Sequence, residues 1–161
     1  MNTYLLVKTL HIMSSVLLVG TGFGSAFYMF FVNRTGPVQA IATISRLVVR
    51  ADWWFTTPAV IFQPLSGFWL MHMAGWTWDT PWLLASFVLY MFAGICWLPV
   101  VWIQIRMRKI ATESAAEGQT ALPPVYWRYA RTWERLGYPA FLAMVAVYFL
   151  MVVKPTIPWI Q

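Results

Sequence analysis

Four long apolar stretches constrain this chain more than any other feature of its sequence. They lie at about residues 4–32, 54–76, 82–105 and 137–154. Each has about the 20 residues that a helix needs to cross the hydrocarbon core of a bilayer. Backbone N–H and C=O groups in lipid must be paired within the protein, which favours helices. We therefore expect residues 1–161 to form one domain, an all-α membrane protein built as a four-transmembrane-helix bundle.

The composition agrees with a membrane protein and excludes several soluble classes. Hydrophobic residues make up 60% of the chain and charged residues 10%, whereas a soluble domain carries about 25% charged residues. The net charge of +6 does not indicate nucleic-acid binding, because the basic residues flank the apolar stretches. The single cysteine, Cys96, allows no disulfide framework and no two-cysteine metal motif. Membrane lipid is the partner that these features predict.

The distribution of basic residues predicts an orientation. Three arginines follow the first stretch and six basic residues follow the third, whereas residues 77–81, between the second and third stretches, contain none. Loops rich in Lys and Arg remain in the cytoplasm. We therefore expect a multi-pass protein of the bacterial inner membrane with both termini on the periplasmic side.

Two polar features fall in or beside the predicted connections. The longest connection, about 106–136, has a small, polar middle that we expect to be mobile. Its end, 126–135, mixes arginines with aromatic residues, which predicts an interfacial helix on anionic lipid. Asp52 lies beside Arg50 at the expected inner interface, where we expect its carboxylate to be solvated or paired.

The chain has two histidines, and both fall inside predicted spans. A titratable ring in hydrocarbon is costly, so its presence suggests a function. At 1.5 Å per residue, His11 lies roughly 10 Å inward from Tyr4, and His72 roughly 6 Å inward from Trp76. Two imidazoles at similar depths on neighbouring helices can bind a haem iron from both sides. We therefore predict haem b, with His11 as an axial ligand and His72 as the second.

Three further residues are candidates for the cofactor site. Lys8 lies one helical turn before His11 and nearer the surface, where its ammonium could meet a haem propionate or reach the lipid headgroups. Gly20 and Gly24 are four residues apart and predict a flat helix face. A porphyrin edge could rest on that face, or a second helix could pack there, as in a homodimer.

Two alternatives remain open at this point. A copper-binding or copper-transport protein could use His11 and His72 with Met71 or Met73, since thioether and imidazole ligands suit Cu(I). A non-catalytic subunit of a larger membrane redox complex could instead dock its partner through residues 126–135.

Two segments carry a resemblance to known families. They are Tyr4-x-x-x-Lys8-x-x-His11-Ile12 in the first stretch and Phe55-Thr56-Thr57-Pro58 with Gly67 in the second. They resemble the HemJ-type protoporphyrinogen oxidases and the CopD-like proteins over about half of the chain. As a whole, the chain resembles a bacterial integral membrane family of unknown function that is related to them.

The resemblance implies specific chemistry. HemJ-type proteins bind haem b through a histidine in the first helix, which corresponds to His11, and CopD-like proteins are implicated in copper uptake. The lysine that HemJ-type proteins use early in the third helix has no counterpart in residues 81–86, which argues against protoporphyrinogen oxidation. We expect a redox protein that exchanges electrons with quinone or oxidises a small substrate.

Overall fold

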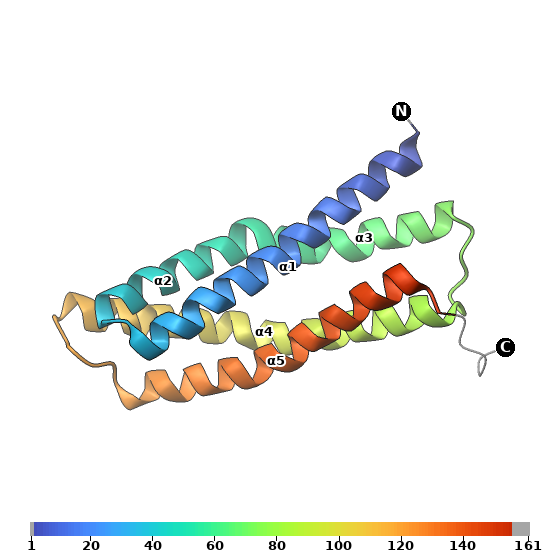
Figure 1. Ribbon diagram of the computed structural model, residues 1–161. Coiled ribbons are helices and arrows are strands. Elements are labelled where there is room, and N and C mark those ends of the chain that lie inside the picture. The colour runs from blue at the N-terminus through green and yellow to red at the C-terminus, as the bar shows by residue number, and fades with distance from the viewer. Residues whose placement is uncertain (1, 156–161) are drawn as a thin grey trace.

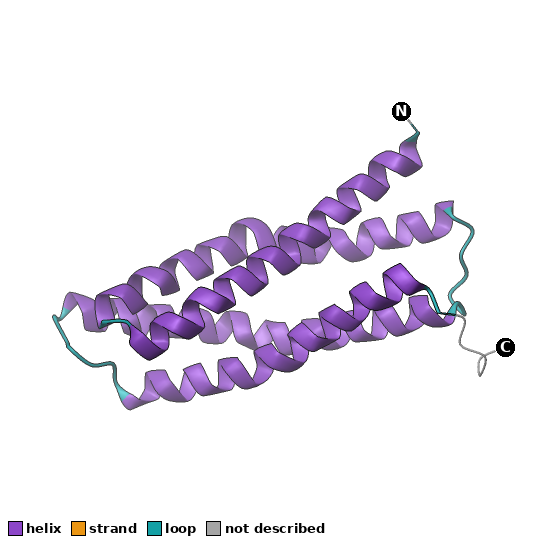
Figure 2. Cartoon of the chain, viewed as in Figure 1, coloured by secondary structure: helices purple, strands orange, loops and turns teal. Residues whose placement is uncertain are grey.

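The computed structural model describes residues 2–155, which fold into helices and short connections without a strand (Figures 1 and 2). The all-α prediction is therefore confirmed for this part of the chain. In chain order the elements are α1 (Thr3–Thr35), α2 (Val38–Ala51), the π-helix η1 (Asp52–Thr56), α3 (Thr57–Met73), α4 (Pro81–Ala116) and α5 (Pro124–Val153).

Helices α2 and α3 form one continuous rod with η1 between them. The backbone stays in the right-handed helical region from Ala51 to Thr57, and the N–H of Asp52 still bonds to carbonyls of α2. The described chain is thus four long helical rods that lie side by side, with consecutive rods running in opposite directions (Figure 1).

Three of the helices, α1, α4 and α5, are long and apolar enough to cross a membrane. Helix α3 has 17 residues and is about 26 Å long at 1.5 Å per residue, somewhat less than the hydrocarbon thickness of about 30 Å. Three of the four predicted spans are therefore supported by length and composition. The span predicted at 54–76, which covers most of η1 together with α3, stays a prediction.

Helical structure extends well beyond the predicted spans. Residues 38–51, expected to be a connection, form α2, and α4 continues through 106–116 before the chain turns into α5. The connection predicted at 106–136 is thus reduced to 117–123. At 36 residues, α4 is about 54 Å long, much longer than the hydrocarbon core is thick. One end of the bundle therefore projects beyond the lipid.

The packed core lies at that projecting, basic end. Its buried side chains come from the end of α1, from α2, from the second half of α4, from the connection after α4 and from the start of α5. They are Met29, Val38, Ile41, Ala42, Val48, Val100, Ile103, Met107, Ala111, Leu122, Tyr126, Ala130 and Trp133. Toward the other end, many large apolar side chains of α1, α3, α4 and α5 are exposed, as expected for contact with lipid.

Residues 126–135 are helical, as expected, but they form the first turns of α5 and pack on protein. Tyr126, Ala130 and Trp133 are buried, whereas the three arginines of the segment are exposed. The Tyr126 hydroxyl donates a hydrogen bond to Asn33 Oδ1 at 2.7 Å. The apolar face of this segment thus stabilises the bundle and is not available to lipid.

Prolines explain two irregular features of the second rod. The ring of a proline collides with the carbonyl four residues earlier in an α-helix, and the wide π-helical turn of η1 lies directly before Pro58. Pro64 cannot donate to the carbonyl of Val60, and the Tyr90 hydroxyl of α4 donates to that carbonyl instead, at 2.7 Å. This bond joins α3 to α4.

An ion pair links α1 to α5 near the basic end. Arg34 donates to both carboxylate oxygens of Glu134, at 3.0 and 3.2 Å, and the two side chains are 44% and 22% exposed. Because solvent screens such pairs, we expect Glu134→Gln to lower the free energy of unfolding by at most about 1 kcal/mol. Unfolding in one fixed detergent measures this. Glu113→Gln is the matched control, since Glu113 pairs with Lys109 at 3.8 Å and is more exposed. A loss of several kcal/mol in Glu134→Gln would contradict the prediction.

Candidate functional site

The first candidate site lies where α1 packs against α3. His11 is half-buried, and its Nδ1 lies 2.7 Å from the hydroxyl of Ser66, a residue 55 positions later in the chain. Ser66 is buried, at 4% exposure. Its hydroxyl also lies 2.7 Å from the carbonyl oxygen of Phe62, one turn earlier in α3.

These two contacts favour one tautomer of the imidazole ring. Each short contact needs one hydrogen, and a serine hydroxyl carries only one. The carbonyl of Phe62 carries none, so the Ser66 hydrogen occupies the contact between the two oxygens. Donation from Nδ1 of His11 to Ser66 is the arrangement that supplies a hydrogen to both contacts. In the neutral ring, Nε2 then keeps its lone pair, which is the form that binds a metal.

Gly67 makes room for the same ring. A Cβ atom built on Gly67 would lie 3.4 Å from Cε1 of His11, so the ring lies against the backbone of α3. Gly67 is one of the residues that carry the resemblance stated above. The helix pair therefore positions His11 through the hydrogen bond to Ser66 and through the contact of its ring with α3 at Gly67.

In the part of the chain that the structure describes, no contact joins His72 to His11. His72 is exposed near the end of α3, six residues beyond Ser66. At 1.5 Å and about 100° per residue, it lies about 9 Å further along the helix and about 240° around it. Lys8 is also exposed, with Nζ 5.7 Å from the centre of the Tyr4 ring.

The Gly20/Gly24 face and Met73 are further candidates for a cofactor or metal site. A Cβ atom on Gly20 or Gly24 would meet nothing within 4 Å, so no other helix in residues 2–155 packs closely on this face. The sulfur of Met73 accepts a hydrogen bond from the Trp69 indole at 2.9 Å. Among the described residues, no group of three or more His, Cys, Asp or Glu side chains is placed to hold a metal ion.

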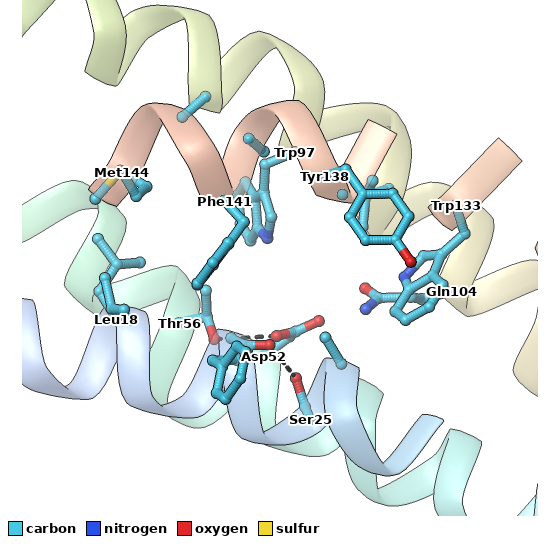
Figure 3. Close-up of a pocket in the computed structure, with 18 of the residues that line it drawn as sticks. Leu18, Ser25, Asp52, Thr56, Trp97, Gln104, Trp133, Tyr138, Phe141 and Met144 are labelled. Carbon is cyan, nitrogen blue, oxygen red and sulfur yellow. Dashed lines mark hydrogen bonds between the residues drawn. The ribbon is translucent and has the colours of Figure 1, made fainter. Parts of the chain in front are cut away.

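The second candidate site is a cavity of about 600 Å³ between α1, η1, α3, α4 and α5 (Figure 3). Aromatic side chains from three helices line it, among them Phe23 of α1, Trp97 of α4, and Tyr138 and Phe141 of α5. Binding sites for small molecules typically enclose about 300–1,000 Å³ and are mostly apolar. The size and lining of this cavity match such a site.

A carboxylate is buried in the wall of this cavity. Asp52 is 4% exposed, and its Oδ1 accepts a hydrogen bond from the Thr56 hydroxyl at 3.0 Å. Within residues 2–155, no group meets hydrogen-bond geometry with its other oxygen, Oδ2, with Oε1 of Gln104 or with Nε1 of Trp133. All three groups are buried and belong to residues that line the cavity. Since buried polar groups are nearly always hydrogen-bonded, these atoms indicate a site for a polar group.

The expectation that Asp52 is solvated or paired with a neighbouring charge is wrong. Its helix does not end at the membrane surface but continues through η1, which holds the carboxylate inside the bundle. One sequence signal was available, because Asp52 and Thr56 are four residues apart and can bond along one helix face. Nothing in the sequence alone places Gln104 or Trp133 beside the same cavity.

The family DUF2269, described as a predicted integral membrane protein, matches residues 5–155. No curated protein and no solved structure matches the chain.

Proposed function

The chain belongs to the DUF2269 family of predicted integral membrane proteins, and we propose a function for it. The protein is a b-type haem protein in which His11 is an axial ligand. The observation that carries the proposal is the 2.7 Å contact between His11 Nδ1 and Ser66. Metal-binding histidines nearly always donate their other ring nitrogen to such an acceptor, which holds the ring in place and keeps the coordinating nitrogen unprotonated.

The other proposed haem contacts are Lys8 and His72. Lys8, on the turn of α1 before His11, is free to turn toward a propionate. His72 remains the proposed second ligand, but α3 would have to rotate, or the cofactor would have to bridge the two positions, for both imidazoles to reach one iron. Haem would supply one-electron redox chemistry. The protein would then exchange electrons with quinone or oxidise a small substrate.

The proposed location follows from the charges. Basic residues gather at the end formed by α2, the end of α4 and the start of α5, and His11 lies toward the opposite end of the bundle. The positive-inside rule then puts the basic end in the cytoplasm. We propose a bacterial inner-membrane protein with periplasmic termini and a haem near the periplasmic leaflet.

The absorption spectrum of the protein purified in mild detergent tests the proposal. We expect a sharp Soret band and iron at about one atom per chain, in protein made by cells that have ample haem. A folded, colourless preparation would refute it. Copper at about one atom per chain without iron would favour the copper alternative.

Replacing Ser66 tests the orienting bond directly. Ser66→Ala is expected to weaken haem binding about 10- to 100-fold, the usual cost of removing a hydrogen bond behind a metal ligand. Haem titration of the haem-free protein measures this. Ser86→Ala is the matched control, because Ser86 is also buried and bonds to the carbonyl one turn earlier, at 2.7 Å, without a histidine partner. Equal affinity in the two variants would show that the Ser66 contact has no part in haem binding.

A further inference from the structure

We propose that the cavity beside Asp52 binds a hydroxyl-bearing aromatic molecule with an apolar tail, such as an alkyl hydroquinone. The inference rests on the cavity and its unpaired polar atoms, and it does not depend on the haem proposal. The head of the molecule would lie among Asp52, Gln104 and Trp133.

The unpaired atoms define the head group. Oδ2 of Asp52 and Oε1 of Gln104 are acceptors, whereas Nε1 of Trp133 is a donor. An ammonium group could serve the two acceptors but not the indole N–H. An anionic head would be repelled by an ionised Asp52. A hydroxyl group donates one hydrogen and also accepts one, so it can satisfy both kinds of partner.

The walls favour an aromatic ring. Trp97, Tyr138 and Phe141 surround the open space (Figure 3). Aromatic rings pack favourably against one another in stacked or edge-to-face arrangements. A planar ring would therefore fit this lining better than a bulky aliphatic group would.

The lining of the cavity also changes from polar to apolar along its length. Gln104 and Trp133 lie at one end, and Leu18 and Met144 lie at the other, with Asp52 and Thr56 along one side (Figure 3). A molecule with a polar ring and an apolar tail matches this gradient. Its head would point toward the basic end of the bundle and its tail toward the middle of the membrane.

The molecule would enter from the bilayer between α1 and α5. Close helix packing joins α4 to α5 and to α2, and α1 to the second rod, but α1 and α5 do not form such a pair. They meet through side chains instead, including the stacked rings of Phe23 and Phe141, whose centres are 5.3 Å apart. Both rings line the cavity and are themselves exposed, so the cavity can be reached from the lipid beside them.

Calorimetric titration with two probes tests the proposal. The first is a short-chain alkyl hydroquinone, and the second is its dimethyl ether, which has the same ring but no O–H group. The unmodified protein is expected to bind the hydroquinone at least about tenfold more tightly, because the hydrogen bond that the hydroxyl donates is lost with the ether and a buried acceptor is left unpaired. Asp52→Leu should remove this preference, and Asp79→Leu, in the exposed turn before α4, should leave it unchanged.

A second variant blocks the cavity without touching the polar atoms. Gly22 lines the cavity, and a Cβ atom there meets nothing within 4 Å, so Gly22→Leu should fold normally and lose binding of both probes. Equal affinity of the unmodified protein for the two probes, as expected if the polar atoms bind only water, would overturn the proposal. So would a preference that persists in Asp52→Leu. Haem content should not change in either variant, which separates this result from the test of His11.

Discussion

Replacing His11 with alanine is expected to leave the purified protein without haem. If haem binds as proposed, the variant loses the imidazole that contacts Ser66, so its haem affinity should fall further than the 10- to 100-fold expected for Ser66→Ala. The Soret absorbance per chain measures the effect, in protein shown to be folded by circular dichroism and gel filtration.

Two further variants make this result specific. His72→Ala removes the exposed histidine of α3, and it should shift the Soret band if His72 is the second ligand, or leave the band unchanged if it is not. His11→Gly leaves a space that free imidazole can occupy, so added imidazole should restore the band. Full haem content in His11→Ala would refute the assignment of this ligand.

Replacing Tyr126 with alanine is expected to destabilise the protein by about 3–5 kcal/mol. Tyr126 is fully buried in the core at the basic end, and deleting a buried aromatic ring has about this cost. Tyr126→Phe keeps the ring but removes the bond to Asn33, so it should cost less, about 1–3 kcal/mol, for the acceptor left unpaired.

Unfolding in one fixed detergent measures both effects. The control is Tyr28→Ala, because Tyr28 is 63% exposed on α1 and exposed substitutions usually change stability by less than about 0.5 kcal/mol. Equal losses in Tyr126→Ala and Tyr28→Ala would show that the basic-end core does not determine stability.

The helices within the apolar stretches could be predicted from the sequence, and those beyond them were missed. Lipid imposes length and apolarity on a span, so α1, α4 and α5 are visible in composition alone. Helix α2 is held by packing on protein, and at 14 residues it is too short to stand out as a span. Its buried positions include 38, 41, 42, 45, 48 and 49, a spacing typical of an amphipathic helix. That pattern was present in the sequence and would have predicted α2.

The candidate sites depend on contacts that no local pattern encodes. His11 stood out because it is a histidine in an apolar stretch, but its partner Ser66 is one serine among several. Asp52 is buried because the second rod continues from α2 through η1 into α3 without a break. The cavity needs side chains from four rods, and its polar end could not be predicted without their arrangement.

The π-helix η1 determines the relative rotation of the two halves of the second rod. One residue more than an α-helix needs turns everything after it by about 100°. The apolar stripe of α2 faces the basic-end core, and Ser66 faces His11, with that offset in place. In a chain one residue shorter at this turn, either the apolar stripe of α2 could face the core or Ser66 could face His11, but not both. The same added residue therefore determines both the packing of the projecting end and the contact between Ser66 and His11.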